Sequence, residues 1–287
     1  MPTQGPLIPR RRLGAALREL RDAAGLHLDA AAAHLECSTS KISRLETGQG
    51  IPKARDIRDL LDLYGIDDQR TRDRLLRLAG EGRRQGWWES ISRSVPPTLE
   101  TYISLESEAN SLSNFTGFAI HGLAQTEEYA RKIYASIFNQ AKPEEVEAMV
   151  RIRMGRQNNL AEREEPLSIA MVLDEGALCR EVGGRQVMRA QLQRLIEFSQ
   201  LPEVRLRILP FSLGHQLGGQ CSYGVFQFDD DIDRNTVNVE LSGGDSWLEQ
   251  ETEVNRYLSL FNSMFRKCPD EPQSRDLILN TLTERFA

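Results

Sequence analysis

The sequence has 287 residues, 40% hydrophobic and 27% charged, a composition that is typical of globular proteins and excludes small disulfide scaffolds, fibrous repeats and wholesale disorder. At this length two domains are expected, and the net charge of −6 argues, as an average, against a partner as acidic as nucleic acid. That average hides two parts: residues 1–86 hold 16 Lys and Arg against 12 Asp and Glu, a net charge of +4, whereas residues 87–287 hold 20 against 30, a net charge of −10.

The chain begins with a leader at residues 1–9 that contains Pro and Gly and is predicted to be flexible. The leader has no apolar core of the kind that a secretory signal needs, and no later apolar run approaches a membrane span, so we expect a cytoplasmic protein with no membrane contact. Arg10, Arg11 and Arg12 follow. They would form a basic arm that contacts DNA, or else part of a solvated leader or a first helical turn.

Three short helices are predicted after the leader. Apolar residues at helical spacing indicate a helix over residues 13–24, and the Ala-rich segment 28–35 indicates a second one. After a sharp break, Ser38 can cap a third helix over residues 39–46. Two short helices joined by a tight turn are typical of the helix-turn-helix unit, in which the second helix reads the major groove of DNA.

The residues of this segment resemble a known family. The string GLHLDAAAAHLECSTSKISRLETG, followed by IP and IRDLLDLYGI, is similar to the Xre, or lambda-repressor-like, helix-turn-helix domain. The resemblance implies an all-α domain of five helices over residues 10–82 that binds DNA. Three positions depart from the usual pattern: Leu28 replaces a Gln that helps to hold a phosphate, Ala31 replaces a Leu, and Glu36 replaces the Gly of the turn.

The outward face of the third helix supplies the candidate base-reading residues. With Ile42 and Leu45 directed to the core, the polar side chains face outward, and Arg and Lys among them can bond guanine or phosphate. These candidates are Thr39, Ser40, Lys41, Ser43 and Arg44. The resemblance places the phosphate contacts around the helix ends, at Ser38, Thr47, Gly48, Gln49 and Lys53. Glu46 is interpreted as a buried or paired structural acid.

The larger, acidic part is predicted to be a mixed α/β (α+β) domain over residues 99–287, after a connector at 83–98. Strand signals at 167–174 and 204–211 flank a helical segment at 184–201 and suggest a βαβ unit. The further predicted helices cover residues 99–113, 125–138, 143–163 and 249–267, and the further strands cover 223–228 and 236–241. The last helix would pack on the core or face a second subunit.

The second domain also resembles a known protein family. The strings GLAQTEEYAR, R-x-R-x-x-R-Q at 151–157, LDEGALCREVGG and RILPF-x-x-G are similar to the C-terminal domain of actinobacterial Xre regulators of the Scr1 antitoxin-like, WhiJ-like type. The resemblance implies a regulator that is paired with a small acidic protein encoded nearby. His121 and Ala124 stand where that family usually has Pro and Leu.

No catalytic, cofactor or metal site is predicted. Asp174 and Glu175 form a carboxylate pair near a strand end, but His121 and His215 belong to no motif that would bring them together, and a capping or turn role explains the acid pair. The four cysteines are far apart and show neither zinc-ligand spacing nor a disulfide framework.

The sequence therefore predicts a regulator that binds double-stranded operator DNA as a homodimer. Its second domain would dimerise, bind the small partner protein, or both. In the alternative, that domain binds a small-molecule effector that changes the geometry of the dimer.

Overall fold

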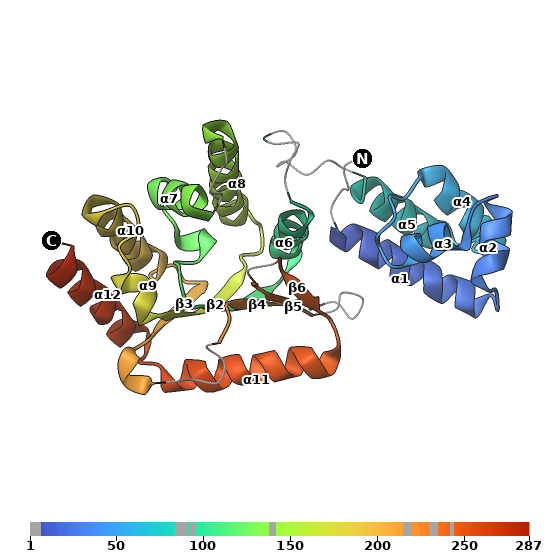
Figure 1. The fold of residues 1–287 in the computed structure, drawn as a ribbon. Helices are drawn as coiled ribbons and strands as arrows, with labels where there is room; N and C mark the ends of the chain where they lie inside the picture. The colour runs from blue at the N-terminus through green and yellow to red at the C-terminus, as the bar shows by residue number, and fades with distance from the viewer. Residues whose placement is uncertain are drawn as a thin grey trace. The chain divides into compact units, whose positions relative to one another are not determined.

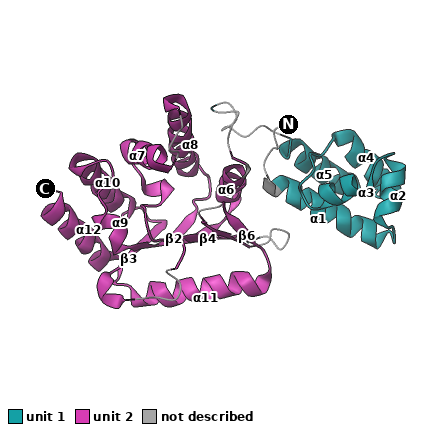
Figure 2. Ribbon diagram, viewed as in Figure 1, with its two compact units in different colours: residues 1–93, 229–233 teal, residues 94–228, 234–287 magenta. Residues whose placement is uncertain are grey.

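The computed structural model describes residues 7–83, 91, 96–137, 142–214, 220–229, 235–241 and 244–286. The chain divides into two compact units (Figure 2). The described part of the first contains helices α1 to α5, and the second contains the remaining helices and all the described strands. No helix in the described ranges is long and apolar enough to cross a membrane.

The first unit is the all-α domain of five helices that the sequence predicts. Its helices are α1 (Leu7–Ala23), α2 (Leu28–His34), α3 (Thr39–Glu46), α4 (Ala54–Leu63) and α5 (Gln69–Glu81). They enclose a core to which every helix contributes, including Leu17, Ala31, Ile42, Leu60 and Leu75. Both Ala31 and Ala32 are buried, so the small side chains of α2 allow the close helix contacts expected from them.

The turn between α2 and α3 is closed by Glu36, which has a φ of 49° and is the non-glycine residue with positive φ in the described ranges. A glycine would adopt this left-handed conformation without steric cost, whereas a glutamate is strained in it. Backbone bonds hold the turn, since the Glu36 amide donates to the Ala33 carbonyl at 3.1 Å and the Cys37 amide donates to the Ala32 carbonyl at 2.9 Å. The helix-turn-helix geometry is therefore kept despite the missing glycine.

The predicted leader and basic arm need correction at their boundary. Helix α1 begins at Leu7, so Arg10, Arg11 and Arg12 lie in its first turns and do not form an extended arm. The Arg10 side chain is buried, with 4% of the residue exposed, because it packs inside the unit close to Gly82. Of the three alternatives for these arginines, the helical turn is correct. Residues 1–6 of the predicted leader lie outside the described residues.

The second unit is an α+β domain around one mixed sheet. Its strands are β1 (Ser111–Thr116), β2 (Ser168–Asp174), β3 (Val204–Leu209), β4 (Tyr223–Gln227), β5 (Thr236–Val239) and β6 (Ser246–Leu248), in the spatial order β3-β2-β1-β4-β5-β6. Strands β1, β2 and β3 are parallel, and β4, β5 and β6 continue the sheet in antiparallel pairs. The predicted βαβ unit is present as β2, α10 and β3.

Helices cover both faces of this sheet (Figure 1). One face carries α11 (Glu251–Lys267), whose residues Val254, Phe261 and Met264 pack on the sheet, so this helix faces the core. The opposite face carries α6 (Pro97–Glu108), α7 (Glu127–Ile137), α8 (Pro143–Ala161) and α10 (Arg185–Phe198). Short helices α9 (Glu175–Cys179), η2 (Gly122–Ala124) and η3 (Phe211–Leu213) lie in the connections, and α12 (Glu271–Arg285) packs beside β3.

The predictions for this unit differ from the structure at one helix end and miss two elements. The helix expected over 99–113 ends at Glu108, and residues from Ser111 onward form the central strand β1. Strand β6 and helix α12 were not predicted, since β6 has only 3 residues and α12 buries little more than Ser274 and Ile278. The connector predicted at 83–98 falls largely outside the described residues, and α6 begins within it, at Pro97.

Candidate nucleic-acid interface

Helix α3 presents one polar face to solvent. Thr39, Ser40, Lys41, Ser43 and Arg44 are all exposed, as predicted, whereas Ile42 and Leu45 are buried at 1% and 6% exposure. The Ser38 hydroxyl caps the helix by accepting a hydrogen bond from the Lys41 amide at 3.3 Å. The Arg44 guanidinium makes no hydrogen bond or ion pair with any residue that the structure describes, so it is available to a ligand.

Close packing against α1 fixes the position of α3. A Cβ atom at Gly14 would lie 2.5 Å from the carbonyl oxygens of Leu45 and Glu46, so only glycine allows α1 to approach the end of α3 this closely. Gly48, directly after α3, has a φ of +73° and packs on Arg11, where a Cβ would lie 2.9 Å from the Arg11 Cγ. The end of α3 is therefore held against the first turns of α1.

An ion pair behind α3 strengthens this contact. Arg21 in α1 donates to Glu46 through two nitrogens, with Nε to Oε1 at 2.7 Å and Nη2 to Oε2 at 3.0 Å. Both side chains are nearly buried, at 8% and 6% exposure, and the Glu46 carboxylate raises the pKa of Arg21. The prediction that Glu46 is a structural acid is confirmed.

Lys41 is exposed but already has a partner. Its ammonium group forms an ion pair with Asp56 of α4, with Nζ 2.7 Å from Oδ2. Because the ammonium group has three N–H donors, a contact with a base would either share Lys41 with Asp56 or displace that carboxylate.

The loop after α3 differs from the predicted phosphate site in its backbone. The amides of Thr47 and Gly48 donate to the carbonyls of Ser43 and Leu45, at 3.0 and 3.2 Å, because Gly48 adopts the left-handed conformation that ends the helix. These two amides are thus already used. Gln49 and Lys53 are exposed, and the Gln49 amide makes no backbone hydrogen bond within the described residues, so they remain the phosphate candidates in this loop.

The carboxylate pair of the second unit has structural roles. Asp174 caps α9 by accepting from the Gly176 amide at 2.8 Å, and Glu175 accepts from the Phe211 amide at 2.7 Å. His121 is buried and hydrogen-bonded to Tyr102, whereas His215 lies outside the described residues. Among the residues that are described, no group of His, Cys, Asp or Glu is placed to hold a metal ion.

Sequence reasoning missed a buried polar cluster in the second unit. Arg156 and Glu106 form an ion pair with Nη2 2.7 Å from Oε2 and side-chain exposures of 5% and 2%, and Arg153 donates to Gln125 at 2.5 Å. Gln157 donates to the Gly122 carbonyl at 2.8 Å. The strings GLAQTEEYAR and R-x-R-x-x-R-Q, which are 20 residues or more apart, thus contact each other here.

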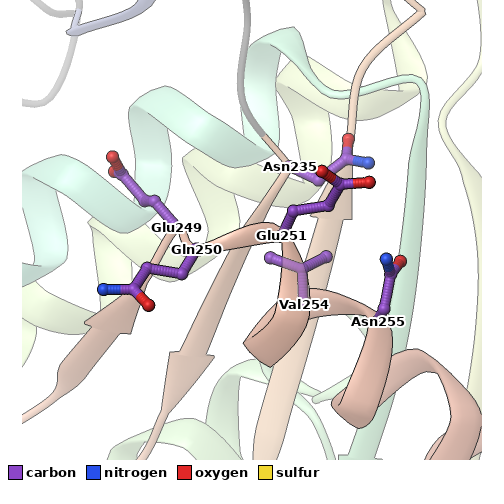
Figure 3. A pocket seen from close by; sticks show the side chains of 6 residues that line it. All are labelled: Asn235, Glu249, Gln250, Glu251, Val254 and Asn255. Atoms are coloured by element: carbon purple, nitrogen blue, oxygen red, sulfur yellow. The ribbon is translucent and has the colours of Figure 1, made fainter.

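A cleft of about 610 Å³ lies at the start of α11 (Figure 3). It is lined by Asn235, Glu249, Gln250, Glu251, Val254 and Asn255. Acidic residues are ordinary in the first turn of a helix, and Asn235 already accepts the Phe228 amide at 3.0 Å. The residues that line the cleft therefore have ordinary roles at the start of a helix, and none of them indicates a ligand.

Comparison with protein families gives two matches. Residues 12–75 match the family described as a helix-turn-helix domain, which supports DNA binding by the first unit. Residues 99–280 match the family described as a domain of unknown function (DUF5753). A comparison with curated proteins finds no match, and neither does a comparison with solved structures.

Proposed function

The chain belongs to the family of the domain of unknown function DUF5753, here preceded by a helix-turn-helix domain, and on this basis we propose that it is a sequence-specific transcriptional regulator. It would bind double-stranded operator DNA through α3. The observation that carries the proposal is the polar face of α3, with five exposed side chains on a helix that α1 holds rigidly through Gly14 and Arg21.

Each side chain of this face has a role in the proposal. Arg44 bonds guanine O6 and N7, while Thr39 and Ser40 contact neighbouring bases. Lys53, Gln49 and the hydroxyl of Ser38 bond phosphates and set the register on the duplex. The +4 charge of residues 1–86 favours approach to DNA, and the −10 part has to lie away from the phosphates.

The proposed regulator is a homodimer. Two copies of α3 would then read two half-sites about one helical turn apart, so the operator should have two-fold symmetry. Dimerisation is assigned to the second unit.

The test is binding of the full chain to DNA from its own upstream region, measured by fluorescence anisotropy at several salt concentrations. We expect a salt-sensitive preference over unrelated DNA, and Arg44→Ala should weaken specific binding about ten- to hundredfold. Arg18→Ala is the matched control, since Arg18 is an exposed arginine of α1 that pairs with Asp22. Unchanged binding by Arg44→Ala, or no preference for the upstream DNA, contradicts the proposal.

Within the family, we assign the chain to the Scr1 antitoxin-like, WhiJ-like regulators, whose second domain binds a small acidic protein encoded nearby. Two exposed aromatic side chains support a protein partner: Phe118, 67% exposed, follows β1, and Phe211, 62% exposed, follows β3. Both positions lie at the carboxyl edge of the parallel strands. Co-purification with the product of a neighbouring gene tests this, and Phe118→Ser with Phe211→Ser should abolish it.

The second candidate role for this unit is binding of a small-molecule effector. The observation that favours it is the buried polar cluster around Arg153.

A further inference from the structure

The sheet of the second unit changes direction beside β1. Strand β1 pairs in parallel with β2 on one side and antiparallel with β4 on the other, so its carboxyl end lies beside the start of β4. Strand β5 is parallel to β1, so Glu240, which follows β5, lies at the edge of the sheet where β1 ends. The Glu240 amide donates to the Ser222 carbonyl at 2.9 Å, and the Ser222 hydroxyl accepts from the amide of Gly117, after β1, at 3.3 Å.

Asn238 is a buried amide with an unused donor. The residue is 1% exposed, and its Nδ2 has no hydrogen-bond partner in the described part of the chain. The Asp245 carboxyl lies beside this amide and interacts with it, which lowers the pKa of that carboxyl against the larger, opposite effect of burial, but Nδ2 makes no hydrogen bond of normal geometry with any described residue. Leaving such a donor unpaired inside a protein costs on the order of 1–3 kcal/mol. A missing acceptor is therefore expected near Asn238.

Tyr102 has a second unused donor. The His121 Nδ1 accepts from the Leu123 amide at 3.3 Å, so the ring proton of neutral His121 is on Nε2 and is donated to the Tyr102 oxygen at 3.0 Å. The Tyr102 hydroxyl proton then has no acceptor among the residues described. Burial raises the pKa of Tyr102, so this proton stays on the hydroxyl.

Arg153 supplies a third donor and a positive charge. Its guanidinium donates to neutral groups only, to Gln125 Oε1 at 2.5 Å and to the Tyr134 hydroxyl at 2.6 Å, and no carboxylate in the described ranges forms an ion pair with it. The buried Nε has no partner. Beside it lies Gly122, where a Cβ would be 3.3 Å from Nε. A side chain at Gly122 would therefore crowd the unused nitrogen.

These donors belong to one region, above the β4 to β6 side of the sheet. Asn238 and Glu240 are two residues apart on β5 and its continuation and therefore face the same side. The Tyr102 ring packs edge-on against Phe226 of β4, at 5.1 Å, and Arg156 lies over the Tyr102 ring at 4.8 Å. Arg153 precedes Arg156 by one turn of α8, which runs beside α6 over this face (Figure 1).

The region also contains an acid without an ion pair. Glu240 is exposed as a residue, but burial of its carboxyl and the nearby charge of Asp245 raise the pKa of that carboxyl, even though Arg153 and Arg156 act in the opposite direction. Asp245 is half-buried nearby, and burial raises its pKa as well. The Arg153 guanidinium, two further donors without a hydrogen-bond acceptor and the Glu240 carboxylate thus share one region, and no ion pair joins Arg153 to Glu240.

We propose that this region binds a small zwitterion of the amino-acid class. Its carboxylate would accept from Arg153 Nε, Asn238 Nδ2 and the Tyr102 hydroxyl, and its ammonium group would face Glu240. The ligand's carboxylate would then face the positive charge of Arg153, and its ammonium group would face the negative charge of Glu240. This gives a ligand class to the effector-binding role proposed above for the second unit.

The test uses the full chain without DNA, so that its outcome is independent of operator binding. The twenty common amino acids are screened by thermal shift, and each hit is measured by isothermal titration calorimetry. We expect at least one amino acid to bind with a stoichiometry of one per chain. For each hit, the matched carboxylic acid without the amino group should bind at least tenfold more weakly, because it leaves Glu240 unpaired.

Three variants locate the site. Arg153→Gln and Glu240→Gln should each weaken binding about ten- to hundredfold, and Gly122→Ala should weaken it by filling the space beside Nε. Arg151→Gln, an exposed arginine of α8, and Glu181→Gln, an exposed glutamate, are the matched controls and should bind like the parent chain. Circular dichroism checks that each variant is folded; Glu240→Gln removes an exposed charge and should fold normally.

Several outcomes overturn the proposal. No binding by any amino acid at millimolar concentration would show that bound water, and no zwitterion, satisfies the unused donors. Equal binding of the matched carboxylic acid would exclude the role of Glu240. Equal binding by Glu240→Gln and Gly122→Ala would place the ligand elsewhere in the chain.

Discussion

Arg21 and Glu46 join the first helix of the DNA-binding unit to the end of α3 through two parallel hydrogen bonds, at 2.7 and 3.0 Å, in a setting that is almost closed to solvent. Removing Arg21 leaves the Glu46 carboxylate buried without the partner of its ion pair. We expect Arg21→Ala to destabilise the first unit by about 3–5 kcal/mol. Hydrogen exchange of the α1 and α3 amides in the full chain measures the loss.

The double variant Arg21→Met with Glu46→Leu is the control for this prediction. Because it removes both charges and keeps apolar volume, it should be more stable than either single substitution. A single Arg21→Ala variant that exchanges as slowly as the parent chain would show that the pair contributes little.

Gly14 and Gly80 form a matched pair of helix glycines with opposite expectations. Alanine at Gly14 would put a Cβ 2.5 Å from two backbone carbonyl oxygens of α3, which cannot move without shifting the helix. At Gly80 in α5 the added Cβ meets no atom within 4 Å. We expect Gly14→Ala to prevent α3 from docking on α1 and so to abolish DNA binding, whereas Gly80→Ala should stabilise the unit by up to about 1 kcal/mol. Thermal unfolding and anisotropy measure both effects, and normal DNA binding by Gly14→Ala would contradict the packing argument.

The α3 helix is the part of the fold that local sequence determines best. Its predicted limits agree with the structure because a capping serine and two inward apolar residues, Ile42 and Leu45, act within one short segment. Strand β1 was missed because its polar residues resemble the continuation of a helix. In the structure Asn114 is buried and its Nδ2 donates to the Tyr223 carbonyl at 3.0 Å, a partner that is 109 residues away.

The candidate sites also differ in how far the local sequence predicts them. The outward face of α3 follows from helical periodicity, but the engagement of Lys41 by Asp56 depends on how α4 packs and has no local signal. The buried cluster around Arg153 brings together side chains from α6, α7 and α8 with Gly122 and Gln125 of the connection between β1 and α7. Periodicity within one element cannot show such a convergence, although the resemblance had singled out the arginines of the R-x-R-x-x-R-Q string.

The ion pair between Lys41 and Asp56 predicts a gain in DNA affinity from a single substitution. Asp56→Asn keeps the shape of the side chain but releases the Lys41 ammonium and removes one negative charge near α3. We expect tighter binding at low salt and a salt dependence that is steeper by about one counterion. Asp59→Asn, which removes an acid paired with Arg55 on the same helix, is the control. If the Asp56→Asn chain bound the upstream DNA no more tightly than the parent chain, the pairing of Lys41 with Asp56 would not limit DNA binding.

His121 predicts the pH dependence of the second unit. Burial, with Arg156 and Arg153 nearby, lowers the pKa of its ring to about 3, from an ordinary value of 6.5. Below pH 6.5 the unfolded chain therefore takes up a proton that the folded chain refuses, so the unfolded state gains stability as the pH falls. Folding should lose up to about 1.4 kcal/mol per pH unit from this residue between pH 6 and pH 4 and nothing above pH 7.

The raised pKa values of Glu240 and Asp245 act in the opposite direction, because these carboxyls bind protons more readily in the folded state. A comparison with His121→Gln isolates the histidine, since the acids are the same in both chains. Urea unfolding of the second unit from pH 7 to pH 4 should show a slope in the parent chain that exceeds the slope in the variant by close to one proton. His27→Gln, a histidine substitution in the first unit, is the control and should leave the unfolding of the second unit as it is. Parallel pH curves for the parent and His121→Gln would mean that the ring is protonated inside the folded unit and that its Nδ1 does not accept the Leu123 amide.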